Sequence, residues 1–141
     1  NLVDFTEVYH ATDPEEWYIG RPGADAPSRA VIAVQSGTVH EAHLRAKGYR
    51  MVPFATEPEV LAALRDGTAD LAFGPFQTRQ DVSAFMADNG LNFLYADMLP
   101  DDGVGMAVCK GNDVLLGRLN TAIAAMRRDG TLAMLENRWF E

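Results

Sequence analysis

The sequence predicts an α/β protein, in which a mostly parallel sheet carries flanking helices and two more helices follow towards the C-terminus. Short apolar runs rich in β-branched residues alternate with segments of helical periodicity, which is typical of βαβ units. Several helical segments start at a capping pattern and stop at a glycine. The chain has 141 residues, 48% of them hydrophobic, which is enough for one globular domain with a single core.

The strands are expected where apolar runs meet turn residues. Residues 30–34 form a continuous apolar run, which suits a strand buried on both faces of a sheet. A turn-rich stretch with two prolines and a glycine, residues 21–29, precedes this run. The chain also starts as if within a strand, and further strands are expected at residues 16–20, 30–34, 50–54, 70–73, 91–96 and 104–109.

The helices are expected to begin at capping signals. Thr38 with Glu41, and Thr56 with Glu59, have the spacing of a capping box, in which each side chain bonds the other residue's backbone amide. Gly48 is placed to stop the first of these helices. The helices are expected at residues 39–47, from 56 to near 67, and at 76–88, 113–128 and 131–140.

Charge and composition exclude several classes of protein. The chain has 20 acidic and 12 basic residues and a formal net charge of −8, which argues against nucleic acid as a partner. Its longest apolar runs, such as residues 30–34, are far shorter than the roughly 20 residues of a membrane-spanning helix. The single cysteine, Cys109, has no internal partner for a disulfide. A small molecule or a basic partner fits this composition better.

The turn between the strand at 30–34 and the helix at 39–47 is the first candidate site. A helix N-terminus has free amides and a partial positive charge, so it can hold a carboxylate, phosphate or sulfate. In an open α/β sheet, ligands gather at the carboxyl ends of strands, and this turn follows such an end. The alternative is that Thr38 and Glu41 only cap each other. The candidate residues are Gln35, Ser36, Gly37, Thr38, Val39 and His40.

A second candidate follows the strand at 70–73 and should open at the same edge of the sheet. Phe76 could stack on a ligand, and Gln77 could hydrogen-bond to it. Alternatively, Pro75 simply starts the next helix and Phe76 packs in the core.

Other chemistries are not favoured. His40 and His43 lie three apart, whereas the zinc-peptidase helix needs them four apart, so no metal is expected, and no cofactor either. We expect His43 to be a surface residue and His40 to be able to reach a bound anion. Ser36 lacks the glycines of a G-x-S-x-G nucleophile elbow, and Cys109 is expected to be a small packed residue.

The order of several motifs resembles the bacterial extracellular solute-binding proteins that serve polar amino-acid ABC transporters, which have the type II periplasmic-binding-protein fold. The most specific motif is the C-terminal M-R-x-D-G-T followed by an aromatic pair. The matching segments span nearly the whole chain in the family's order: residues 3–9, 33–38, 62–70, 105–112, 126–131 and 138–140.

This resemblance implies two α/β lobes joined by two crossover strands, with the ligand held between them. Residues 1–9 would end the first lobe, residues 10–103 would form the second, and residues 104–141 would return to the first. The strand-like start is then expected to be a cut, with the N-terminal part of the first lobe absent. The hinge residues would be Tyr9, His10, Ala11, Gly103 and Gly105.

The implied function is that of the substrate-binding component of an ABC importer, periplasmic or extracytoplasmic, with a membrane permease as partner. The turn from Gln35 to His40 would hold the carboxylate of a small polar solute. Two departures from the family stand out: Val39 replaces a hydroxyl residue, and Pro75 stands where amino-acid binders commonly have an aspartate. An ammonium buried without a carboxylate would be costly. We therefore expect either a ligand other than a free standard α-amino acid, or an amine bound entirely by the other lobe.

Two alternatives belong to other classes. The superfamily includes enzymes that resemble cyclohexadienyl dehydratases, and such chemistry would fall on His40 or Glu41, although we expect no enzyme here. The chain could instead be an interaction fragment, because the amphipathic helices after Asn112 would expose an apolar stripe and self-associate.

Overall fold

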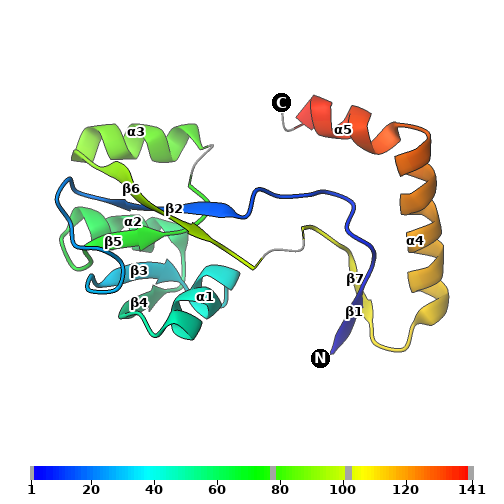
Figure 1. Cartoon of the computed structure of the whole chain (residues 1–141), viewed down its shortest axis with the longest axis horizontal. Helices are drawn as coiled ribbons and strands as arrows, with labels where there is room; N and C mark the ends of the chain where they lie inside the picture. The colour runs from blue at the N-terminus through cyan, green and yellow to red at the C-terminus, as the bar shows by residue number, and fades with distance from the viewer. Residues whose placement is uncertain (1, 77–78, 101–102, 140–141) are drawn as a thin grey trace. The chain divides into compact units, whose positions relative to one another are not determined.

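The computed structural model describes residues 2–76, 79–100 and 103–139, and it confirms the α/β fold class (Figure 1). The chain divides into two compact units, one made of residues 1–13 and 101–141 and the other of residues 14–100.

The unit of residues 14–100 contains a five-stranded sheet of order β4-β3-β5-β2-β6. β3 is parallel to β4 and β5, whereas β2 is antiparallel to β5 and β6, so the sheet is mixed rather than mostly parallel. The segment between β2 and β3 consists of turns and contains no crossover helix. The two strands therefore run in opposite directions in the sheet. The strands are β2 (Glu15–Gly20), β3 (Ile32–Gln35), β4 (Met51–Phe54), β5 (Leu71–Phe73) and β6 (Asn92–Met98).

Three helices cover this sheet: α1 (Val39–Lys47), α2 (Glu57–Arg65) and α3 (Gln80–Asn89). The capping box predicted at Thr56 and Glu59 is present, whereas Thr38 and Glu41 form only one of its two bonds, because the Glu41 side chain accepts from the Gly37 amide. The Glu41 amide donates to Thr38 Oγ1 over 3.3 Å, and the Thr56 amide donates to Glu59 Oε2 over 2.9 Å. The third helix begins at Gln80, whereas the sequence predicted a start at residue 76.

The reason for this later start lies in the side chain of Phe76. It is 1% exposed and packs in the core, so the chain at this point turns inward instead of starting a helix. The Phe76 amide donates to the carbonyl of Gly74 over 2.9 Å, and the extended Arg79 is the residue that caps α3.

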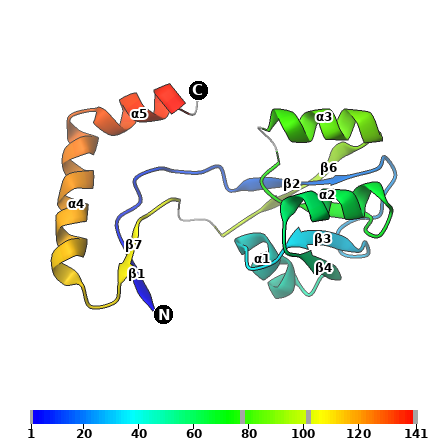
Figure 2. The ribbon, with the colours of Figure 1, turned by 180° about the vertical axis from the view of Figure 1, so that it is seen from behind.

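Alternate residues of the strands pack on opposite faces of the sheet. Ala33 faces the core under α2 and α3, whereas Ile32 and Val34 face the core under α1, as the two-residue period of a strand requires. Figure 2, seen from behind, shows α2 in front of the strands, and Figure 1 shows α1 on the opposite side. The largest fully buried side chains are Tyr18, Ile19, Ile32, Leu44, Leu64, Leu71, Phe73 and Phe76, among others.

The parallel part of this sheet positions the candidate site. Because β4, β3 and β5 run in the same direction, their carboxyl ends lie at one edge. The segments that follow them therefore meet there: residues 36–38 before α1, residues 55–56 before α2, and residues 74–76 after β5.

The other unit contains an antiparallel pair of strands, β1 (Val3–Phe5) and β7 (Ala107–Cys109), followed by α4 (Asp113–Arg128) and α5 (Thr131–Trp139). The predicted strand at 104–109 is shorter than expected, because Val104 takes part only in an isolated bridge with His10. Cys109 is exposed and not packed, which corrects the sequence-based expectation. Among the described residues, no helix is both long and apolar enough to cross a membrane.

Candidate functional site

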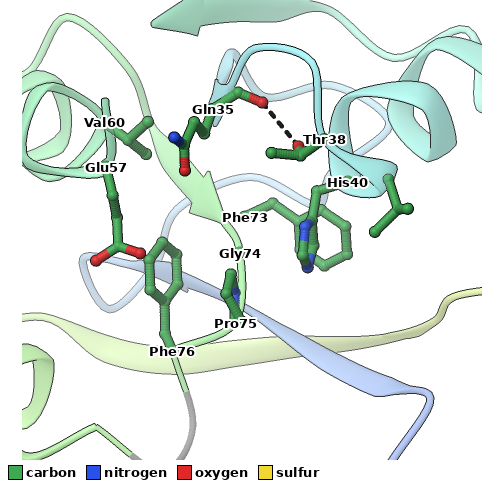
Figure 3. A pocket seen from close by; sticks show the side chains of 10 residues that line it. Gln35, Thr38, His40, Glu57, Val60, Phe73, Gly74, Pro75 and Phe76 are labelled. Carbon is green, nitrogen blue, oxygen red and sulfur yellow. Dashed lines mark hydrogen bonds between the residues drawn. The ribbon is translucent and has the colours of Figure 1, made fainter. Parts of the chain in front are cut away.

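A pocket of about 220 Å³ lies at the edge where β3, β4 and β5 end (Figure 3). It unites both turns predicted from the sequence and adds the start of α2. The lining residues are Gln35, Thr38, Val39, His40, Glu57, Val60, Phe73, Gly74, Pro75 and Phe76.

The N-terminus of α1 supplies the hydrogen-bond donors of this pocket. Glu41 satisfies two groups there: its amide bonds Thr38 Oγ1, and its Oε2 accepts from the Gly37 amide over 2.7 Å. Within the described part of the chain, no partner is found for the amides of Val39 and His40. These two donors carry the partial positive charge of a helix N-terminus, so this wall of the pocket suits an anion.

Ser36 and Gly37 shape the turn without lining the pocket. The Ser36 hydroxyl donates to the carbonyl of Phe54 over 3.0 Å, and the Thr38 hydroxyl donates to the carbonyl of Gln35 over 2.7 Å. Gly37 has φ +75°, a left-handed conformation that favours glycine. Gln77, the remaining predicted ligand-binding residue, lies outside the described residues.

The imidazole of His40 lies at the base of the pocket. Its side chain is 10% exposed, and its ring meets the Phe73 ring edge-on at 5.2 Å. Nε2 is 3.6 Å from Glu16 Oε1, beyond hydrogen-bond distance. Among the described residues, neither His40 Nε2 nor the buried Glu16 Oε2 has a hydrogen-bond partner. A buried polar atom without a partner is costly. His40 Nε2 and Glu16 Oε2 are therefore placed to form a hydrogen bond with a further polar group.

His43 is not a surface residue, contrary to the prediction. Its side chain is 9% exposed, and Nε2 lies 3.1 Å from Asp97 Oδ2. Asp97 also accepts from Lys47 Nζ at 2.6 and 2.7 Å and from the Tyr18 hydroxyl at 2.9 Å. Since His43 and Lys47 lie in the middle and at the end of α1, Asp97 ties this helix to β6.

The pKa values in this cluster follow from its contacts. Burial acts to raise the pKa of Asp97, but the hydrogen bonds, that of Lys47 first, hold this pKa below its ordinary value. Burial, and then the hydrogen bond with Asp97, raise the pKa of the Tyr18 hydroxyl. Asp97 therefore stays ionised and Tyr18 neutral at physiological pH.

Apolar side chains form the remaining walls. Phe76 is buried among the residues under α2 and α3, as one of the two sequence interpretations stated, and it also lines the pocket. The Tyr18 ring stacks on the Phe73 ring at 4.2 Å, which holds Phe73 in place. Pro75 is exposed at the rim.

Glu57 is a pocket residue that sequence reasoning missed. It is the first residue of α2, its side chain is 19% exposed, and its Oε1 lies 2.5 Å from Arg79 Nη1. A signal was present in the sequence. The capping box assigns Glu59 to the helix cap, which leaves Glu57 free, and β4 ends at the same edge as β3.

A mixed α/β sheet whose parallel strands end at a small pocket beside a helix N-terminus is suited to binding a small solute. The chain belongs to the bacterial extracellular solute-binding proteins, family 3, whose family model matches residues 1–141. The family resemblance predicted from the motifs is thus confirmed.

Curated and solved relatives agree with this assignment. The chain is 29% identical, over 99% of its length, to the putative ABC transporter arginine-binding protein 2 of Escherichia coli. A periplasmic His/Glu/Gln/Arg/opine family-binding protein from Silicibacter pomeroyi, in complex with lysine, matches 99% of the chain with 30% identity and a TM-score of 0.79. An ancestral arginine-binding protein bound to arginine matches 99% of it with 25% identity and a TM-score of 0.72.

These matches cover only part of the relatives. The chain spans 60% of the Escherichia coli protein, 62% of the Silicibacter pomeroyi protein and 65% of the ancestral protein.

Proposed function

We propose that the chain belongs to the substrate-binding component of an ABC importer and contributes one lobe, residues 10–103, to a site for a small carboxylate-bearing polar solute. The observation that carries the proposal is the pair of free amides, of Val39 and His40, at the pocket wall formed by the N-terminus of α1. The compact unit of residues 14–100, which holds the whole pocket, supports this lobe assignment.

Recognition of the carboxylate would rest on α1. A hydrogen bond to a charged group contributes about 1.5–3 kcal/mol, and the two amides lie where the helix dipole favours an anion. Thr38 is already engaged with Gln35 and Glu41, so it would contribute through the turn that it holds. Val39 therefore serves through its backbone, and its lack of a hydroxyl does not remove this pair of donors.

The size of the pocket supports a site shared between two lobes. Complete small-molecule pockets usually measure about 300–1,000 Å³. At about 220 Å³, this pocket fits part of a solute and leaves the rest to a facing surface. The relatives bind arginine or lysine, which supports a basic amino acid, or a derivative of one, as the solute.

Closure of the two lobes would use the strands on either side of residues 9–11 and 103–105. Backbone bonds join these strands: Tyr9 N donates to Val104 O over 2.9 Å, and Val104 N donates to His10 O over 2.8 Å. Gly103 has φ +90°, and a Cβ there would lie 2.5 Å from the Val8 side chain. A hinge at Tyr9, His10, Ala11, Gly103 and Gly105 would absorb the rotation, with ligand contacts favouring the closed form.

The partner of the whole receptor would be the membrane permease of the importer, and its location periplasmic or extracytoplasmic. The family and the periplasmic relatives support both statements.

The enzymatic alternative receives less support from the same geometry. Glu41, one of its two candidate residues, is occupied by the Gly37 amide and by Arg45, whose Nη2 lies 2.6 Å from Glu41 Oε1. His40, the other candidate, has its Nε2 buried beside Glu16. Glu41 is therefore engaged elsewhere, and His40 is the one of the two candidates that lines the pocket. A single buried imidazole beside a carboxylate supports binding without turnover better than acid–base chemistry.

Titration calorimetry on the intact protein tests the proposal. L-arginine and L-lysine are expected to bind, whereas agmatine, which is arginine without its carboxylate, is expected to bind at least tenfold more weakly. Equal affinity for arginine and agmatine would contradict a carboxylate site at α1. A cyclohexadienyl carboxylate incubated with the protein should remain unchanged, and its conversion would favour the enzyme.

A further inference from the structure

We propose that Glu57 receives the cationic nitrogen of the solute, opposite the carboxylate at α1. This inference rests on the proposed function and deepens it. Pro75 and Phe76, which follow β5, carry no charge, so the pocket needs a carboxylate from another residue if it is to meet an ammonium or guanidinium group. Glu57 is the acidic residue that lines the described pocket.

The position of Glu57 follows from the sheet. β4 lies beside β3 and parallel to it, so the helices that follow these strands, α2 and α1, begin at the same edge. Figure 3 shows Glu57 and Phe76 on one side of the pocket and His40 and Phe73 on the other. A solute with charges of both signs could therefore span from the amides of α1 to this carboxylate.

Glu57 is not needed to cap its own helix. The amide and the hydroxyl of Thr56 both donate to Glu59 Oε2 over 2.9 Å, which closes the capping box without Glu57. An acid in the first turn also gains from the helix dipole, but Glu59 supplies that effect equally. A structural role for Glu57 would therefore rest on its ion pair with Arg79 alone.

The charge balance around Glu57 leaves an excess of negative charge. Arg79 is shared between two carboxylates: Nη1 lies 2.5 Å from Glu57 Oε1, and Nη2 lies 2.5 Å from Asp81 Oδ2. A second bond, from Arg79 Nε to Asp81 Oδ1 over 3.2 Å, ties the guanidinium more firmly to Asp81. One cation thus faces two anions, and this end of the pocket attracts a further cation.

Glu57 also has a free acceptor. Within the described residues, no hydrogen bond is formed by its Oε2, while Oε1 is held by Arg79. The hydrogen bond with Asp81 and the charge of Glu57 raise the pKa of Arg79, so its guanidinium stays charged. Arg79 therefore orients the Glu57 carboxylate and leaves one oxygen for a ligand N–H.

Calorimetry with Glu57→Gln tests the inference, because this substitution removes the charge and keeps the shape. L-arginine is expected to bind the variant at least tenfold more weakly than the unaltered protein. Asp66→Asn, an exposed acid outside the pocket, is the matched control and should leave the affinity unchanged. Thermal unfolding of both variants checks that α2 remains folded.

Two further probes identify the nitrogen that Glu57 receives. L-norvaline has the α-ammonium but no guanidinium, and 5-guanidinopentanoate has the guanidinium but no α-ammonium. A weaker affinity of Glu57→Gln for norvaline alone assigns the α-ammonium, and a weaker affinity for guanidinopentanoate alone assigns the guanidinium.

Asp81→Asn gives a second, independent measurement. It touches no pocket residue but releases Arg79 to neutralise Glu57, so arginine affinity should fall several-fold. If arginine binds Glu57→Gln and Asp81→Asn as tightly as the unaltered protein, the inference is wrong and the proposed function stands. If the unaltered protein binds none of these probes, the proposed function fails, and this inference fails with it.

Discussion

Asp97→Asn is expected to destabilise the unit of residues 14–100 by about 3 kcal/mol at pH 7. The Tyr18 hydroxyl, whose residue is 1% exposed, would lose a charged acceptor, which costs about 1.5–3 kcal/mol. Lys47 is 36% exposed in its side chain, so its two contacts with Asp97 contribute only about 1 kcal/mol after screening. The sum rests mainly on the buried hydroxyl.

The effect should depend on pH in a defined direction. The folded-state pKa of Asp97 lies below the unfolded value of about 3.9, so its stabilising contribution is complete above that value. The contribution is lost as the pH falls through the folded-state pKa. Urea unfolding, followed by tryptophan fluorescence from pH 7 down to pH 2, should therefore show the two proteins converging in stability at the acid end.

The control for this prediction is Asp66→Asn. Asp66 also has a lowered pKa, caused first by its hydrogen bond with Arg65, but it is fully exposed, and solvent screens its interaction. No measurable loss of stability is expected from it. If Asp97→Asn were as stable as the unaltered protein at pH 7, or if its deficit did not shrink as the pH fell below about 3.9, Asp97 would not anchor α1.

Three further changes test other parts of the chain. Phe76→Ala should cost about 3–5 kcal/mol in urea unfolding, because it empties a buried site, and an unchanged midpoint would contradict that packing. Gly37→Ala should cost about 1–2 kcal/mol through its φ of +75° alone, since no atom lies within 4 Å of the added Cβ. The 141-residue chain should self-associate through exposed apolar residues of α4 and α5, such as Val114, Met134 and Trp139, and light scattering from a strict monomer at high concentration would refute this.

Elements with local signals at both ends were predictable from the sequence. α1 runs over residues 39–47, as predicted, because Thr38 caps its start and Gly48 takes the left-handed conformation at its end. α4 also has its predicted bounds, and the Asn112 side chain accepts from the Leu115 amide. These signals act within a few residues, so no tertiary information is needed to read them.

Features that depend on tertiary contacts were not predictable in the same way. The predicted start of α3 was wrong. Proline is typical of a first helical position, so Pro75 indicated a helix from residue 76, but the burial of Phe76 directs the chain into the core there. His43 reads as a polar helix residue, and only the pairing of β2 with β6 brings Asp97 beside it. The direction of β2 likewise follows from its partners in the sheet and not from its own residues.

The histidines of α1 show how one motif can serve the site without binding metal. His43 faces Asp97 and His40 faces Glu16, so the two imidazoles approach carboxylates on neighbouring strands, β6 and β2. Phe73 lies beside both rings, which keeps the polar contacts away from water. The two histidines thus hold on the sheet the helix whose N-terminus, with the amides of Val39 and His40, is the proposed anion site.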